Sequence, residues 1–94
     1  MPAWFYILRL CSGNYYCGST KDREQRYNAH FTGRGCRTTR VDSPIEVLHE
    51  EKFNTYRETF HREHQVKRWT RAKKEALIDG RMYLLKKLAK RRRK

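Results

Sequence analysis

The sequence predicts an α+β domain in which a small three-stranded antiparallel sheet is flanked by helices. Three short runs of aromatic and branched residues, separated by turn-forming or polar segments, have the character of strands. The first run carries apolar side chains on both faces, so we expect helices to cover both sides of the sheet. A length of 94 residues suits one small domain and leaves little chain for a second.

The first two strands are predicted at residues 4–10 and 15–18. Their sequences, WFYILRL and YYCG, are rich in residues that favour strands. The residues between them are typical of tight turns: Ser12, Gly13 and Asn14. We therefore expect a β-hairpin.

The register of this hairpin decides whether two of its tyrosines share a face. A three-residue loop that pairs Cys11 with Tyr15 places Tyr6 and Tyr16 on one face of the sheet. A two-residue Gly13-Asn14 turn is also chemically reasonable and places them on opposite faces. The sequence leaves both alternatives open.

A helix is predicted after the hairpin. Ser19 or Thr20 can cap it, Asp22 falls in its first turn, and nothing breaks the pattern before Phe31. The polar, basic and turn-rich residues 33–43 are expected to form a loop.

The third strand and two further helices are predicted in the second half. Pro44 opens a strand over residues 45–53, whose first half alternates apolar and polar residues. Residues 56–69 are compatible with a helix, and Thr70 looks like the N-cap of a shorter helix that ends at Gly80. We expect one domain over residues 1–80, followed by a short apolar turn and a basic tail over residues 81–94.

The charge of the chain indicates its kind of partner. Lys and Arg number 23 against 10 Asp and Glu, which gives a formal net charge of +13. Such a chain repels itself unless it binds a polyanion, and nucleic acid is the first expectation, with an anionic membrane surface second. No apolar run approaches the roughly 20 residues of a membrane-spanning helix, and the start lacks the pattern of a signal peptide. We expect a soluble, cytoplasmic protein.

The three cysteines, Cys11, Cys17 and Cys36, suggest no covalent framework. Their number is odd, and they form neither a C-x-x-C pair nor a zinc-finger spacing with histidine. We expect them to be reduced and mostly buried.

Two pairs of helical residues are candidates for phosphate and metal chemistry. Arg26 and His30 are spaced i, i+4, so both could reach a phosphate beside the sheet, although a solvated basic face explains them equally well. Glu63 falls on the more apolar side of its helix and needs a partner. That partner is either Lys67, one turn on, or a divalent cation.

The combination of motifs resembles the GIY-YIG endonuclease domain, and in particular the small stand-alone bacterial proteins of that superfamily. Trp4-Phe5-Tyr6 and Tyr16-Cys17-Gly18 stand at the two triplets, Arg26 and His30 follow at the family's spacing, and Glu63 lies on a later helix. The likeness runs from about residue 4 to residue 78 and includes YCGST, REQRYNAH, Thr38-Thr39-Arg40 and REHQVKRWTRAKKEALI. The sequence departs from the family at Trp4, Phe5 and Cys17, at Arg23, which replaces an apolar residue, and in having no asparagine after Asn54.

The resemblance implies a metal-dependent DNA endonuclease that hydrolyses phosphodiester bonds in DNA repair, recombination or processing. Tyr6 would take a proton from the attacking water, its pKa lowered by nearby cations such as Arg26. Tyr16 and His30 would complete the hydrogen-bond network, Arg26 would also clamp the phosphate, and Glu63 would hold one Mg²⁺ or Mn²⁺ ion. Further contacts to nucleic acid are expected from Arg23, Arg34, Arg37, Arg40 and Lys67. The alternative is a non-catalytic module that binds DNA or RNA through the same basic face.

Overall fold

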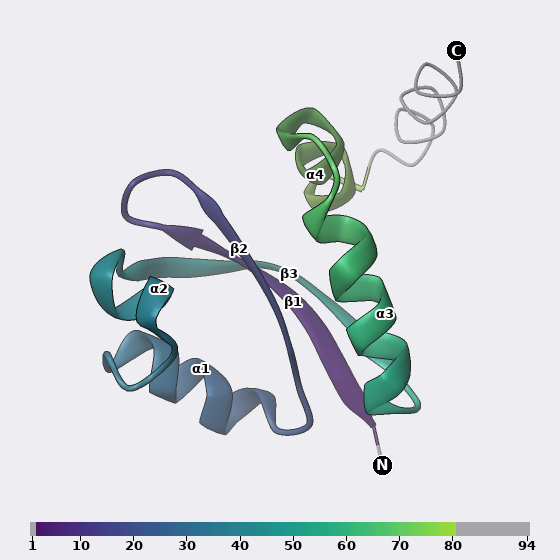
Figure 1. Ribbon diagram of the computed structural model, residues 1–94, viewed down its shortest axis with the longest axis horizontal. Helices are drawn as coiled ribbons and strands as arrows, with labels where there is room; N and C mark the ends of the chain where they lie inside the picture. The colour runs from purple at the N-terminus through teal and green to yellow at the C-terminus, as the bar shows by residue number, and fades with distance from the viewer. Residues whose placement is uncertain (1, 81–94) are drawn as a thin grey trace.

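A computed structural model describes residues 2–80 of the chain and confirms the predicted fold class (Figure 1). Three antiparallel strands form one sheet in the order β2-β1-β3. The predicted basic tail over residues 81–94 lies outside the described residues. The elements, in chain order, are β1 (Ala3–Leu10), β2 (Tyr15–Thr20), α1 (Arg23–Phe31), α2 (Arg37–Val41), β3 (Pro44–Phe53), α3 (Tyr56–Lys67) and α4 (Arg71–Ile78).

The hairpin between β1 and β2 has the three-residue loop, placed one residue earlier than predicted. The closing pair is Leu10 and Asn14, with a 2.9 Å hydrogen bond from the Leu10 N–H to the Asn14 carbonyl, and not Cys11 and Tyr15. Gly13 ends the loop with a φ of 92°, a left-handed conformation that glycine adopts without a steric penalty. In both placements, paired residues are either both odd-numbered or both even-numbered. Tyr6 and Tyr16 therefore lie on the same face of the sheet in spite of the shift.

Each face of the sheet is covered by its own pair of helices. In Figure 1, α1 and α2 lie on one side of β2, and α3 and α4 lie on the other. Odd-numbered strand residues pack with α3 and α4 in the hydrophobic core, formed by Phe5, Ile7, Cys17, Val66, Ala76 and Leu77. Even-numbered residues, including the fully buried Tyr6, face α1, whose His30 is also fully buried.

The first helix begins later than predicted. Thr20 is the last residue of β2, and its hydroxyl accepts a hydrogen bond from the Asp22 N–H at 3.0 Å. Asp22 is the N-cap of α1, because its carboxylate accepts from the Gln25 N–H at 3.2 Å. The expectation that Ser19 or Thr20 caps the helix is therefore wrong.

The segment predicted as a loop contains the short helix α2. It is tied to other parts of the chain: the Ser12 N–H donates to the Asp42 carboxylate at 3.0 Å, and the Thr39 hydroxyl lies 2.9 Å from Nδ1 of His30 in α1. Tertiary hydrogen bonds thus stabilise five residues whose own sequence gives little helical signal.

The second half follows the prediction closely. Thr55 and Thr70 cap α3 and α4, each accepting a backbone N–H three residues on. None of the helices within residues 2–80 is long and apolar enough to cross a membrane. All three cysteines are free thiols, but only Cys17 is buried, so the expectation that they are mostly buried is wrong. Cys11 lies in the exposed hairpin loop.

Candidate active site

Four of the residues predicted to be catalytic meet beside strand β2. The Tyr6 hydroxyl lies 2.9 Å from His30 Nε2, and Arg26 Nε donates a hydrogen bond to it at 3.3 Å. The Tyr16 ring lies 5.3 Å from the His30 ring and 6.5 Å from the Tyr6 ring, measured between centroids. The hairpin register therefore places both tyrosines on the face that α1 covers.

The hydrogen bonds around His30 favour one position for its ring proton. The Thr39 hydroxyl, with one proton to give, donates to the Cys36 carbonyl and lies 2.9 Å from His30 Nδ1. In this arrangement it accepts from His30 Nδ1–H, and Nε2 is unprotonated. The Tyr6 hydroxyl donates to that Nε2. Proton donation thus runs from Tyr6 to His30, from His30 to Thr39 and from Thr39 to Cys36.

Two glycines make room for this network. A Cβ on Gly18 would lie 2.5 Å from Tyr6 Cζ, and a Cβ on Gly35 would lie 2.5 Å from His30 Nδ1 and 2.8 Å from Thr39 Oγ1. Real Cβ atoms do not approach so closely, so any larger residue must displace buried groups. Gly18 belongs to the second triplet, whereas the parts played by Gly35 and Thr39 were missed from the sequence, which places them in a presumed loop.

The protonation equilibria of the site are set mainly by burial. Burial raises the pKa of Tyr6, and the hydrogen bond and charge of Arg26 oppose that rise without cancelling it. The expectation that nearby cations lower this pKa is therefore wrong for the structure as it stands. Burial, helped by the charge of Arg26, lowers the pKa of His30 to about 4, so its imidazole is neutral at pH 7. Tyr16 also has a raised pKa, because of burial first and its contact with Cys36 second.

Glu63 approaches the site from the other side of β2. Its Oε1 accepts a hydrogen bond from the Ser19 hydroxyl at 2.7 Å, and its Oε2 forms an ion pair with Lys67 Nζ at 2.7 Å. The negative charge of Glu63 contributes to the raised pKa of Tyr6, although burial contributes more. The ion pair with Lys67, one of the two partners considered from the sequence, is present, and the carboxylate is 15% exposed.

A divalent cation would depend on Glu63 as its one acidic protein ligand. Within residues 2–80, no group of three His, Cys, Asp or Glu side chains lies close enough to hold a metal ion. A single hard carboxylate suits Mg²⁺, which keeps several waters and is commonly bound by one or two carboxylates together with a substrate phosphate. The Glu63 carboxylate can bind such a cation once Lys67 Nζ moves away from its Oε2 atom. A single carboxylate does not suit a cation that needs all its ligands from the protein.

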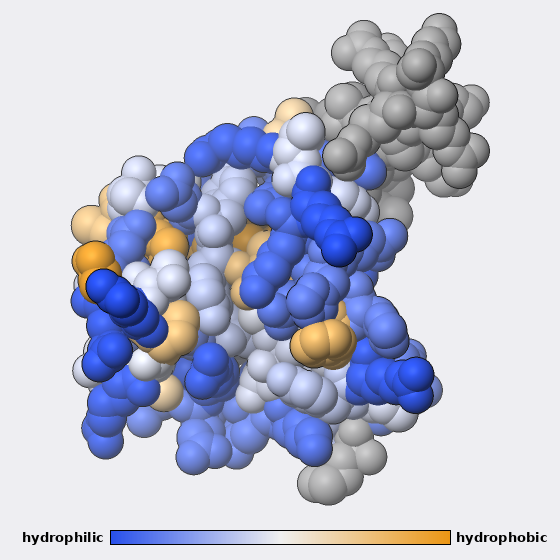
Figure 2. All heavy atoms as spheres, viewed as in Figure 1, coloured by the Kyte–Doolittle hydropathy of each residue, from blue (hydrophilic) through white to orange (hydrophobic). Residues whose placement is uncertain are grey.

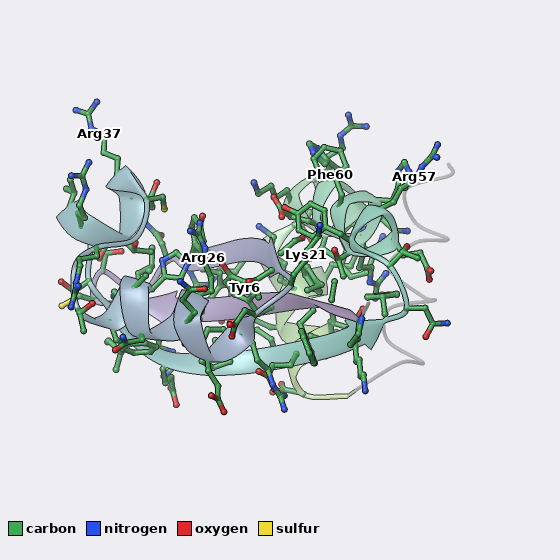
Figure 3. All side chains as sticks on the ribbon, turned by 90° about the horizontal axis from the view of Figure 1, so that it is seen from below. Tyr6, Lys21, Arg26, Arg37, Arg57 and Phe60 are labelled. Carbon is green, nitrogen blue, oxygen red and sulfur yellow. The ribbon has the colours of Figure 1, made fainter. Side chains whose placement is uncertain are left out.

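The predicted nucleic-acid contacts differ in their availability. Arg34, Arg37 and Arg40 are exposed, and none of them forms an ion pair with the residues that the structure describes. Arg23 pairs with Glu50 at 3.1 Å and lies over the Trp4 ring, while Lys67 is held by Glu63. In Figure 3, Tyr6, Arg26 and Lys21 lie between two raised flanks that carry Arg37 on one side and Arg57 on the other.

The fold and this set of side chains define the GIY-YIG class of catalytic domain. The GIY-YIG catalytic domain family matches residues 2–76, and the chain belongs to that family. Its relatives include UPF0213 proteins from Bacillus pumilus, 38% identical over 81% of this chain and 78% of the relative, and from Halobacterium salinarum, 38% identical over 78% of this chain and 95% of the relative. The solution NMR structure of a UPF0213 protein from Bacillus halodurans matches with a TM-score of 0.55 and 33% identity, over 84% of each chain.

Proposed function

We propose that this chain is a metal-dependent DNA endonuclease that hydrolyses phosphodiester bonds, with a role in DNA repair, recombination or processing. The observation that carries the proposal is the convergence of three side chains on one oxygen: the Tyr6 hydroxyl lies within hydrogen-bonding distance of both the neutral imidazole of His30 and the guanidinium of Arg26. Hydrolysis of a phosphodiester needs a means of removing a proton from water and a positive charge for the phosphoryl oxygens. The three side chains supply both.

In this proposal, Tyr6 relays a proton and does not act as a free phenolate. The raised pKa of Tyr6 disfavours a standing negative charge, but its hydroxyl already donates to His30 Nε2. As Tyr6 oxygen takes a proton from water, its own proton passes to Nε2, and the resulting hydroxide attacks phosphorus. The 3′ oxygen departs and takes a proton from solvent. His30 then carries the positive charge, with Nδ1–H still donating to Thr39.

Arg26 controls access to this relay. Tyr6 is fully buried, and Arg26, which is half-buried and lines a surface pocket with Thr20 and Asp22, occupies one acceptor position of its oxygen. A phosphate bound in this pocket attracts the guanidinium and draws it from the hydroxyl, which frees that position for water. Bound at Glu63, a divalent cation would supply positive charge at the departing oxygen.

The same structural facts favour a second candidate function, a nucleic-acid-binding module without catalysis. The candidate active site must rearrange before it can react, because Tyr6 is fully buried and Glu63 is already paired with Lys67. The exposed arginines Arg34, Arg37 and Arg40 need no rearrangement to bind phosphates.

Cleavage assays with three variants separate the two functions. We expect supercoiled, nicked or branched DNA to be cut in the presence of Mg²⁺ or Mn²⁺, and Tyr6→Phe and Glu63→Gln to abolish cutting while retaining the fold and DNA binding. Lys67→Gln is the matched control for Glu63→Gln, because it breaks the same ion pair and keeps the carboxylate. If Glu63 serves only this ion pair, both changes should cost a few tenths of a kcal/mol and leave cutting intact.

Two outcomes contradict the proposal. Undiminished cutting by a folded Glu63→Gln protein would exclude the metal assignment. An absence of cutting by the parent on every substrate, with binding intact, would establish the binding module instead.

A further inference from the structure

A row of aromatic rings runs along the exposed side of α3. Tyr56, Phe60 and His64 are spaced i, i+4, i+8 and therefore follow one another along the helix. Phe60 is 47% exposed and Tyr56 is 40% exposed, and the Phe60 and His64 rings lie 4.3 Å apart. One exposed aromatic residue needs no explanation, but three aromatic rings on one face of a helix, two of them 4.3 Å apart, form a surface that a flat ligand can cover.

The row lies on one of the two flanks that border the candidate active site. Helix α3 is anchored to β2 through Ser19, whose hydroxyl donates to the Thr59 carbonyl at 3.2 Å and to Glu63. Lys21, in the turn after β2, lies 5.5 Å from the Tyr56 ring centre. Figure 3 shows Phe60 on the flank above Lys21, and Arg37 on the opposite flank, with Tyr6 and Arg26 between them. The rings thus lie on one of the two flanks between which Tyr6 and Arg26 lie.

The surroundings of the row are cationic. Lys21 and Arg57 are exposed, and neither pairs with an acidic side chain among the residues that the structure describes. Figure 2 shows an isolated hydrophobic spot over α3 with hydrophilic side chains around it. Rings bordered by positive charge match a nucleic-acid strand with accessible bases, because its phosphates need cations and each base has a flat face. A continuous duplex offers phosphates but hides the faces of its bases in the stack.

We propose that Phe60 and Tyr56 form a stacking platform for unpaired bases, so that the preferred substrate is DNA with unpaired nucleotides next to the scissile phosphate, as in a branch or flap. The preference for a substrate rests on the proposed endonuclease function. Stacking of bases on the platform is a binding property and does not depend on cleavage. Phe60 is the central ring, with Tyr56 and His64 as its neighbours along the helix, so an unpaired base is expected to stack there first.

Binding measurements without a divalent metal test the platform independently of catalysis. Fluorescence anisotropy in EDTA compares three labelled probes of one sequence: a single strand, a forked duplex with two unpaired arms, and a continuous duplex. Replacing Phe60 by Ala should weaken binding of the first two by about tenfold, as expected for the loss of one base–ring stack. Binding of the continuous duplex should change less than about twofold on the same grounds.

Three further variants identify the contact. Phe60→Trp keeps a flat face and should retain affinity, and Phe60→Leu keeps apolar bulk without it and should behave like Phe60→Ala. Phe31→Ala removes a phenylalanine of similar exposure, 45%, at the end of α1 and should leave every affinity unchanged. Equal losses on all three probes, unchanged affinity for Phe60→Ala, or full retention by Phe60→Leu would each overturn the proposal. A parent that binds these probes selectively but never cuts them refutes the endonuclease function and leaves the platform standing.

Discussion

Thr39→Val is expected to remove the hydrogen bond between His30 and Thr39 with almost no change in side-chain volume. Thr39 is 1% exposed and His30 is fully buried, so water cannot replace the lost hydroxyl. The Cys36 carbonyl keeps the Arg40 N–H as a donor at 3.1 Å, so the main loss is the acceptor for His30 Nδ1–H. An orphaned buried donor costs about 1–3 kcal/mol, which for a domain of this size lowers Tm by roughly 5–20 °C.

The same substitution should change the chemistry of His30. With no acceptor at Nδ1, the ring proton is expected to move to Nε2, where it points at the Tyr6 oxygen and removes the acceptor that Tyr6 needs. If Tyr6 relays a proton to His30, cleavage should fall by roughly 100-fold, the usual scale of a lost acid–base partner. Thr38→Val, at the exposed neighbouring position, is the control and should alter neither Tm nor cleavage.

Thermal melting and ¹⁵N NMR of the imidazole nitrogens provide the measurements. In the parent, His30 should show a protonated Nδ1 and a bare Nε2. The reasoning is refuted if the parent carries its proton on Nε2, or if Thr39→Val leaves both Tm and the tautomer unchanged.

Three other predictions follow from the geometry and charge. Gly18→Ala should lower the free energy of unfolding by about 1–3 kcal/mol and abolish cleavage, because the new Cβ meets the ring of the buried Tyr6. Gly13→Ala is strained by its positive φ but has open space around it, so it should destabilise the fold without affecting cleavage. Equal losses of activity in the two variants would refute this. Between pH 6.5 and about 4, His30 is neutral in the folded chain and protonated in the unfolded one, so the contribution of His30 to the free energy of unfolding should fall on acidification through this window and stay constant below it; an NMR titration of His30 with a midpoint near 6.5 instead of 4 would contradict this. Affinity for duplex DNA should fall by orders of magnitude between roughly 50 and 200 mM salt if six or more phosphates are contacted, and a flat response would count against both candidate functions.

Structural features that depend only on a short stretch of sequence were predictable. Thr70 caps a helix, as predicted, because a side-chain oxygen next to a helix start needs only the backbone N–H three residues on. The shared face of Tyr6 and Tyr16 depended on the parity of the hairpin loop, which the sequence left open, and the structure resolved it in favour of the shared face. The helical phase of Glu63 correctly indicated a partly buried carboxylate that needs a partner.

Features created by contacts between distant segments were not predictable. Helix α2 forms where Ser12 meets Asp42 and His30 meets Thr39, and neither pair leaves a local signal. The pKa of Tyr6 shows the same limit, because counting nearby cations predicts a fall while the extent of burial, known only from the fold, produces a rise.

The central position of β1 in the sheet has a consequence for how the chain folds. The strand nearest the N-terminus pairs with β2 on one edge and with the much later β3 on the other. A growing chain can form the hairpin early, yet one edge of β1 stays unpaired until β3 has been made. The hairpin meanwhile exposes Phe5 and Ile7 with no helix to cover them, which invites pairing with other chains.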